Sequence, residues 1–328
     1  ALPAQTQRVL RIAAVSGRRV RHERLAAVSG LDDEDLDQAL REAVAQHVLV
    51  LDRPGDPTAD GYVFRHALLR EAIYQELLPG ERTRLHARHA EHLAAKAEPG
   101  SAAELAHHAY AGHDLVRALA ASVVAADEAD ARSAPAEALF QLERALELWH
   151  TVPDPETVTG TCEAAVTRAA SWYASHAGDP DRAVQLGRRA AELAEADKDD
   201  LMTARCARGL AQLLLDLPGH EPEALATARR ALALLTEQPP SADLAWAHCT
   251  LARAFWRVDR PADADEHARA AVAVVDGMDL TGSLQHRAGE AIWTEAIGAE
   301  AIGAKADGLI TMSICAQHIG EDELSLRL

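Results

Sequence analysis

Histidine offers the densest chemistry in this sequence, because imidazole nitrogens bind zinc and exchange protons near neutral pH. Five histidines and a glutamate fall within one short stretch: His86, His89, His92, Glu104, His107 and His108. The first three are spaced H-x-x-H-x-x-H. At about 100° per residue, His86 and His92 lie about 120° apart around a helix, so these three cannot share one metal ion. We expect structural histidines between packed helices, with metal binding as the alternative.

Cysteine is the next candidate for metal, redox or nucleophilic chemistry. The four cysteines stand 44, 43 and 66 residues apart, without a C-x-x-C pair: Cys162, Cys206, Cys249 and Cys315. This spacing favours small buried residues in a reducing cytosol over a disulfide or metal framework. The sequence also lacks the G-x-S-x-G motif of hydrolases and the H-E-x-x-H motif of metalloproteases. We therefore expect no enzyme and no metal site.

One stretch near the end of the sequence approaches a phosphate-binding loop. Gly298 and Gly303 are separated by four residues, but Ala304 stands between the second glycine and Lys305. A Walker A loop needs Lys and then Ser or Thr at once, after a strand. We instead predict a helix over 292–310 and no ATP site in this chain.

The elements that must position these residues begin with three helices and a hairpin. Apolar spacing predicts helices over 5–15, 22–28 and 32–48, and strands over 48–51 and 62–64 around a polar Pro-Gly turn. This order is typical of a winged-helix domain, whose third helix enters the DNA major groove when the domain binds DNA.

Charge argues against DNA binding here. The third helix sets a single arginine, Arg41, against six acids: Asp32, Asp33, Glu34, Asp35, Asp37 and Glu42. The chain carries a net charge of −18, most of it after residue 100, which repels nucleic acid. A basic run precedes the third helix: Arg8, Arg11, Arg18, Arg19, Arg21 and Arg24. We interpret it as a solvated face, with contact to an acidic partner or a nucleotide domain as the alternative.

Two helices follow the hairpin. The first has an apolar side formed by Leu68, Leu69, Ile73, Leu77 and Leu78. Pro79-Gly80 is expected to stop it. The second has an apolar stripe formed by Leu85, Ala90 and Leu93.

This region resembles the join between the winged helix and the helical repeats in signal-transducing ATPases with numerous domains (STAND), particularly the large ATP-binding transcriptional regulators of the LuxR type. The likeness covers about residues 1–150 and rests on Phe64 to Ala72, Tyr74, Leu77 to Pro79, Arg84 to His86 and Glu104 to His108. It implies a middle fragment, with a nucleotide-binding core upstream and a DNA-reading helix-turn-helix downstream.

The same resemblance assigns a role to His66. His-Ala-Leu-Leu-Arg is similar to the Met-His-Asp motif of related receptor ATPases, in which the histidine contacts the β-phosphate of ADP. Ala67 replaces the aspartate of that motif. The resemblance therefore implies that His66 and Arg65 contact ADP of the missing ATPase domain, so ATP or ADP belongs to the full-length protein and not to this chain. A strand-end histidine bonded to nearby backbone is the alternative.

Beyond residue 105 the sequence predicts pairs of helices with a repeated pair of alanines. They stand seven residues apart in each repeat: Ala138 and Ala145, Ala183 and Ala190, Ala224 and Ala231, Ala264 and Ala271. A small residue every two turns lets a neighbouring helix approach closely. The pattern resembles a tetratricopeptide (TPR) array with lengthened repeats, and the best match also includes Leu251, Ala252 and Phe255.

Such an array forms a concave surface that binds a peptide, a protein or a small effector. We predict that Trp246 and Trp256 belong to this ligand surface and that Phe255 is a buried packing residue. Core packing of all three is the alternative.

The fold expected is mainly α, with a winged-helix domain over 1–78, linking helices over 79–112 and TPR-like repeats over 113–328. Ala and Leu dominate the 48% apolar residues and aromatics are 4%, which favours closely packed helices and excludes a disordered chain. Neither a membrane span nor a secretory leader is visible, so a cytoplasmic location is expected.

The predicted function is a regulatory module that couples effector binding on the repeats to the protein's own ATPase domain, without direct DNA or membrane contact. The alternatives are the regulatory region of a nucleotide cyclase or protein kinase with the same arrangement, and a plain repeat scaffold. The sequence beyond either end would distinguish them.

Overall fold

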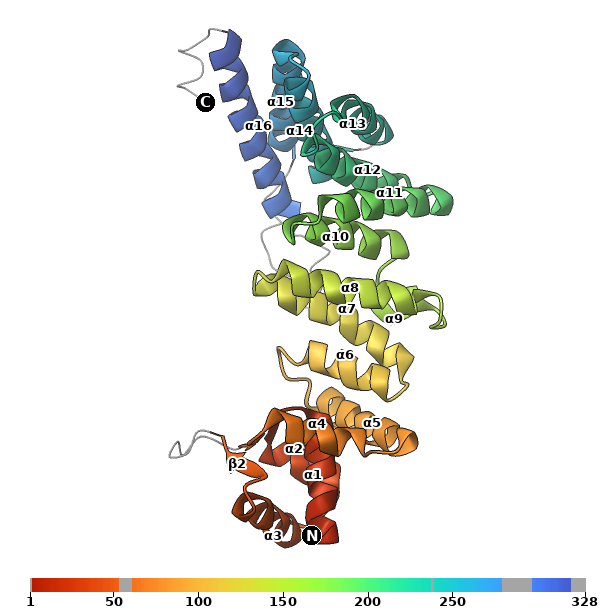
Figure 1. Cartoon of the computed structure of the whole chain (residues 1–328). Coiled ribbons are helices and arrows are strands. Elements are labelled where there is room, and N and C mark those ends of the chain that lie inside the picture. Colours follow the sequence, from red (N-terminus) through yellow and green to blue (C-terminus); the bar gives the residue numbers. More distant parts are fainter. Residues whose placement is uncertain (1, 53–60, 237–238, 279–296, 320–328) are drawn as a thin grey trace. The chain divides into compact units, whose positions relative to one another are not determined.

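A computed structural model of the chain describes residues 2–52, 61–236, 239–278 and 297–319, with side chains over 303–315 in the last helix (Figure 1). The chain packs into two compact units. The first contains residues 1–128 and 147–158, and the second contains residues 129–146 and 159–328. The predicted turn at 53–57 lies outside the described residues, and the predicted three-domain division stays a prediction.

The first unit begins with a small α and β domain. Its elements are α1 (Ala4–Ser16), β1 (Arg19–Arg21), α2 (His22–Ser29), α3 (Asp33–Ala45), β2 (Leu49–Leu51) and β3 (Gly61–Phe64). The three strands form an antiparallel sheet in the order β1-β3-β2. The helices and the sheet enclose a core that includes Ile12, Leu25, Leu36, Leu49 and Phe64, all fully buried.

Two features of this domain differ from the sequence prediction. Strand β1 was not predicted, because three residues with charge at both ends give too short an alternation to recognise. Helix α3 ends at Ala45 and not at Val48, because His47 adopts a positive φ of 56° and the Val48 amide donates to the Ala43 carbonyl, which closes the helix. Its beginning is as expected: Asp32 caps the helix by accepting from the Asp35 amide at 2.9 Å.

Three helices follow this domain in the first unit: α4 (Ala67–Gln75), α5 (Pro79–Lys96) and α6 (Ala102–Ala111). Pro79 does not stop α4, since it occupies the first turn of α5, where its missing N–H costs nothing. The apolar side predicted for the first of these helices is only partly covered: Leu77 is buried and Ile73 packs on the core, whereas Leu68 is 84% exposed. In α5, Ala90 and Leu93 are buried as predicted.

The second unit is a stack of helix pairs. Figure 1 shows α10 (Glu163–His176) with α11 (Pro180–Asp197), α12 (Asp200–Leu215) with α13 (Glu221–Leu235), and α14 (Ala242–Arg257) with α15 (Pro261–Asp276). The helices α7 (Leu115–Ala131), α8 (Pro135–Trp149) and α9 (Pro155–Thr159) precede the stack, and α16 (Ile297–Ile319) follows it. Proline in the first turn starts α11, α13 and α15.

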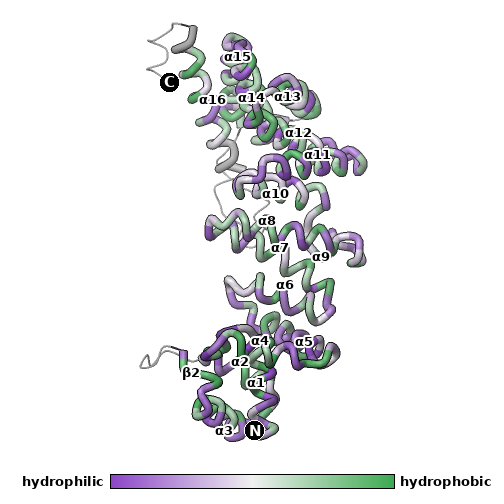
Figure 2. Tube along the Cα trace, viewed as in Figure 1, coloured by the Kyte–Doolittle hydropathy of each residue, from purple (hydrophilic) through white to green (hydrophobic). Residues whose placement is uncertain are grey.

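The predicted alanine pairs are confirmed as the contact positions of this stack. All eight alanines are at most 1% exposed: Ala138, Ala145, Ala183, Ala190, Ala224, Ala231, Ala264 and Ala271. Ala138 and Ala145 lie on α8, and the other six lie on the second helix of each pair, where hydrophobic and hydrophilic segments alternate along the tube in Figure 2. Methyl side chains at these positions let the paired helices approach closely, so the repeats are held by small-residue packing.

The helix predicted over 292–310 is present from Ile297 onward, and residues 292–296 lie outside the described residues. Gly298 and Gly303 are both inside α16, so the stretch that approached a phosphate loop is helical. Among the described helices, none has the length and apolar content needed to cross a membrane.

Candidate functional site

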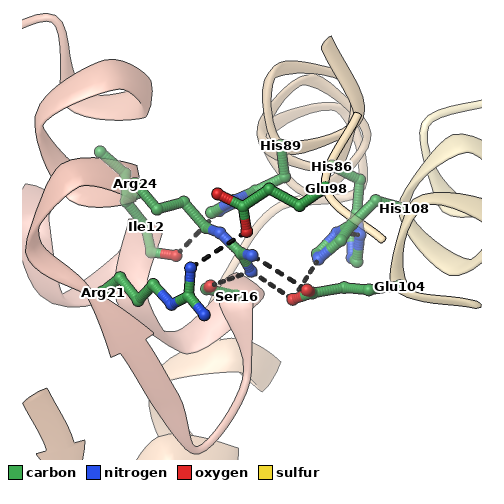
Figure 3. A network of polar contacts seen from close by, with 9 residues as sticks. All are labelled: Ile12, Ser16, Arg21, Arg24, His86, His89, Glu98, Glu104 and His108. Atoms are coloured by element: carbon green, nitrogen blue, oxygen red, sulfur yellow. Dashed lines mark hydrogen bonds and ion pairs between the residues drawn. The ribbon is translucent and has the colours of Figure 1, made fainter. Parts of the chain in front are cut away.

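The predicted histidines form a buried network in the first unit (Figure 3). His86 and His89 lie on α5 and His108 lies on α6, and each is at most 1% exposed. The Nδ1 atoms of His86 and His108 are 2.9 Å apart, and the rings of His89 and His108 stack with their centroids 4.9 Å apart. All three are buried between packed helices, the location that we expected for structural histidines.

The remaining two predicted histidines lie at the edge of this network. His107 is exposed, and its ring meets those of His86 and His108 edge-on at 5.4 and 5.3 Å. His92 is half-buried on the next turn of α5. In the described part of the chain, no three side chains of the metal-ligating types are arranged to hold an ion.

A glycine allows the close approach of the two helices. Gly112 ends α6, and a Cβ at this position would lie 2.9 Å from the Ala87 nitrogen and 3.0 Å from the His108 carbonyl oxygen. Any larger residue would have to push α6 away from α5. The His86–His108 contact therefore depends on this glycine.

Burial keeps the network neutral. Loss of solvent lowers the pKa of His86 to about 4, of His89 to about 3 and of His108 to about 2. The His89 Nε2 lies 3.3 Å from the Ile12 carbonyl oxygen, and a carbonyl can only accept, so Nε2 carries the proton. The opposite nitrogen, Nδ1, is buried without a hydrogen-bond partner among the described residues.

Three arginines of the basic run form ion pairs with acidic residues of the first unit. Arg24 forms a two-pronged ion pair with Glu104 of α6, with Nη2 at 2.9 Å from Oε2, and also lies near Ser16 (Figure 3). Arg21 reaches Glu98 at 3.0 Å. Arg11 lies 3.7 Å from Glu81. The expected solvated face holds for Arg11 and Arg21, whose side chains are exposed, and is incorrect for Arg24, which is largely covered and joins α2 to α6.

The residues predicted to face a nucleotide lie where β3 gives way to α4. The Arg65 amide donates to the Val48 carbonyl at 3.1 Å, and the His66 carbonyl accepts from the amides of Leu69 and Arg70. The backbone is thus held on both sides of the two side chains, which are both exposed. The His66 imidazole makes no capping hydrogen bond to α4.

Arg70 is turned away from this position. Its Nε donates to the Ala14 carbonyl at 2.9 Å, and its guanidinium lies 5.2 Å from the centre of the Tyr74 ring. Arg70 therefore caps a carbonyl in the last turn of α1 and packs on Tyr74 of its own helix. Arg65 and His66, the two residues of the predicted phosphate contact, are exposed, whereas Arg70 is half-buried.

The predicted ligand surface of the repeats is more covered than expected. Trp246 on α14 is half-buried, and Gly303 of α16 leaves room for its ring, since a Cβ there would lie 3.2 Å from Cζ2. Trp256 is half-buried, so its role stays a prediction. Phe255 is 4% exposed, which confirms it as a packing residue.

The described indole with the most exposed surface is one that sequence reasoning missed. Trp172 on α10 is 50% exposed, and its ring centroid lies 4.1 Å from that of His176. It stands 11 residues before Ala183, as Arg253 stands 11 before Ala264. The equivalent residue 11 positions before Ala224 is the buried Leu213, so the repeat alignment gave no signal of this exposure.

The cysteines are free and mostly buried. Cys206, Cys249 and Cys315 are buried and Cys162 is half-buried, and none is in a disulfide. Burial raises the pKa of Cys206 and of Cys249 to about 12. These are small packing residues, as the sequence indicated.

Comparison with known proteins finds no matching family model and no matching curated protein. Among solved structures, BtubC (BKLC) from P. vanneervenii is similar with a TM-score of 0.51 and 13% identity, over 77% of this chain and 88% of that chain. A STAND protein with a tetratricopeptide repeat sensor from Pyrococcus horikoshii has a TM-score of 0.43 and 12% identity, over 99% of this chain and 49% of that chain. The quorum sensor NprR from B. thuringiensis has a TM-score of 0.47 and 12% identity, over 93% of this chain and 72% of that chain. At this identity, the likeness to BtubC shows a shared helical-repeat fold and nothing about activity.

Proposed function

We propose that this chain is the regulatory segment of a STAND-type, ATP-dependent transcriptional regulator. In this proposal the first domain is a winged helix that contacts the protein's own ATPase domain. The repeats bind a protein, peptide or small-molecule effector. The output is a shift between an ADP-bound resting state and an ATP-bound active state, driven by different effector affinity for the two.

The observation that carries the proposal is the uncovered start of α4. Arg65 and His66 are exposed, no residue of α4 is buried, and Leu68 and Leu78 are 84% and 71% exposed. An arginine and a hydrogen-bond donor beside exposed leucines suit the edge of a nucleotide-binding domain, where the apolar residues are covered and the polar side chains face phosphate. The element order α1-β1-α2-α3-β2-β3 with a three-stranded antiparallel sheet supports the winged-helix interpretation.

In this proposal the exposed His66 donates to a phosphate. Hydrogen bonds on both sides of it hold its backbone, so little freedom is lost when the side chain engages a ligand. A hydrogen bond to a charged group contributes about 1.5–3 kcal/mol, and about 1.4 kcal/mol corresponds to a factor of ten in affinity. Removing the imidazole should therefore weaken ADP binding at least about tenfold and favour the active state.

The experiment compares full-length protein with its His66→Ala variant, measuring retained ADP and activity without inducer. The matched control is His176→Ala, which removes an exposed histidine from α10. The proposal expects ADP loss and raised basal activity in the first variant alone. Wild-type ADP retention together with wild-type basal activity in His66→Ala would reject the phosphate contact.

A further inference from the structure

A polar path of two hydrogen bonds and one longer contact runs through the first unit from α4 to α6. The Tyr74 hydroxyl on α4 lies 3.1 Å from the His86 Nε2 on α5. The His86 Nδ1 lies 2.9 Å from the His108 Nδ1 on α6. The other nitrogen of His108, Nε2, lies 3.9 Å from the Glu104 carboxylate one turn earlier on α6.

The proton positions along this path are linked. A neutral imidazole has one N–H, and two Nδ1 atoms in contact require one to donate and the other to accept. If His86 donates from Nδ1, its Nε2 accepts from Tyr74, and His108 carries its own proton on Nε2. If His108 donates instead, its Nε2 is a bare lone pair. There are therefore two arrangements, with opposite directions.

Glu104 selects between them. An Nε2–H of His108 points a positive dipole at the carboxylate, whereas a lone pair there would repel it. Arg24 holds that carboxylate in place with two contacts. At the Glu104 end, the favoured arrangement is therefore the one in which His86 donates to His108.

The opposite end favours the same direction. The guanidinium of Arg82 lies 4.5 Å and that of Arg70 5.2 Å from the centre of the Tyr74 ring. Cations over the ring withdraw electron density from the phenol and strengthen its O–H as a donor. Tyr74 is therefore set to donate to His86.

We propose that Tyr74, His86, His108 and Glu104 form a directional chain that fixes the position of α4 against α5 and α6. Every donor in the chain points from α4 towards α6. Displacing α4 removes the Tyr74 hydroxyl, which donates to the buried Nε2 of His86. The hydrogen bond from His86 to His108 is weakened as a result. These residues are positioning residues. Through them, the hydrogen bonds of α6 depend on the position of α4. This proposal rests on the proposed function in one respect: the ATPase domain is what would displace α4.

The first test is the tautomer of each histidine, measured by nitrogen NMR on the whole chain with labelled histidine. We expect the Nδ1–H form for His86 and the Nε2–H form for His108. The reverse assignment, or an equal mixture at both, would overturn the directional chain. The measurement requires no ATPase domain, so its outcome is independent of the nucleotide proposal.

The second test perturbs each end of the chain. Glu104→Gln removes the negative charge and offers an amide, so the Nδ1–H form of His86 should lose its dominance although residue 104 is not in contact with that ring. Tyr74→Phe leaves Glu104 intact, so the tautomers should stay and the amides of α6 should exchange with solvent at least about tenfold faster.

Tyr62→Phe is the matched control for the second variant. Its hydroxyl also contacts a histidine, with 3.3 Å to the His22 Nδ1, but the pair is outside the chain. Exchange in α6 should stay at the wild-type rate in this variant. Unchanged His86 tautomers in Glu104→Gln would refute the direction, and equal α6 exchange in Tyr74→Phe and Tyr62→Phe would refute the coupling.

Discussion

Acid should destabilise the first unit through its buried histidines. The unfolded chain has histidine pKa values near 6.5, and burial lowers those of His86, His89 and His108 to about 4, 3 and 2. Below pH 6.5 the unfolded chain binds protons that the folded chain does not, so the free energy of unfolding falls as the pH falls. Above pH 6.5 neither state binds these protons, and this contribution is constant.

The magnitude follows from proton linkage. Between pH 7 and pH 5 each of the three groups removes about 2 kcal/mol of stability, and together they remove at most about 6 kcal/mol. Domains are typically stable by about 5–15 kcal/mol, so this loss is large. The side chains are at most 1% exposed, so solvent screens little of the effect.

The assay is a urea titration at several pH values between 7 and 5, read from hydrogen exchange of peptides in α5 and α6. His89→Leu removes one titrating group at nearly constant volume, so its stability should fall by about 2 kcal/mol less over this range than that of the wild type. A flat wild-type profile, or the same slope in His89→Leu, would refute the reasoning.

Three further predictions concern packing and reactivity. Ala231→Leu should overpack α13 and cost about 1–3 kcal/mol in denaturant titrations, whereas Ala226→Leu on the exposed side of the same helix should change stability by less than about 0.5 kcal/mol. Gly112→Ala should separate α6 from α5 and speed amide exchange in both, whereas Gly80→Ala, whose Cβ would meet a flexible arginine at 3.4 Å, should not. In native thiol labelling at pH 8, Cys162 should react before the three buried cysteines, and equal rates would contradict their burial.

The repeats could be predicted because their signal is local. Ala183 and Ala190 lie seven residues apart on one helix, so a period in the sequence reports directly on the buried face. The same holds for Phe255, which occupies a packing position in the best-formed repeat. Helix bounds were less accurate where a backbone change decides them, as at His47.

The polar contacts could not be predicted, because their partners are distant in sequence. Arg24 and Glu104 are 80 residues apart, and no local pattern distinguishes a solvated arginine from one whose acid arrives on a later helix. Trp246 shows the same limit in the repeats. The sequence around Trp246 predicted a position in the groove. The packing of α16, where Gly303 leaves space for the indole ring, could not be read from that sequence.

Both units contain buried alanines and partly buried polar contacts, and the polar network of the first unit is the one that reaches α4. In the second unit, fully buried alanines such as Ala224 and Ala264 bring helices together, and the Nδ1 atoms of His248 and His267 form a second histidine contact at 3.1 Å. In the first unit, neutral imidazoles and the Arg24–Glu104 pair occupy the space between α2, α5 and α6. A buried hydrogen-bonded network tolerates few alternative arrangements, because each shift leaves a polar group without its partner. The network can therefore fix one position of α4, which carries His66 at its start, whereas a surface of alanines could not discriminate between neighbouring positions.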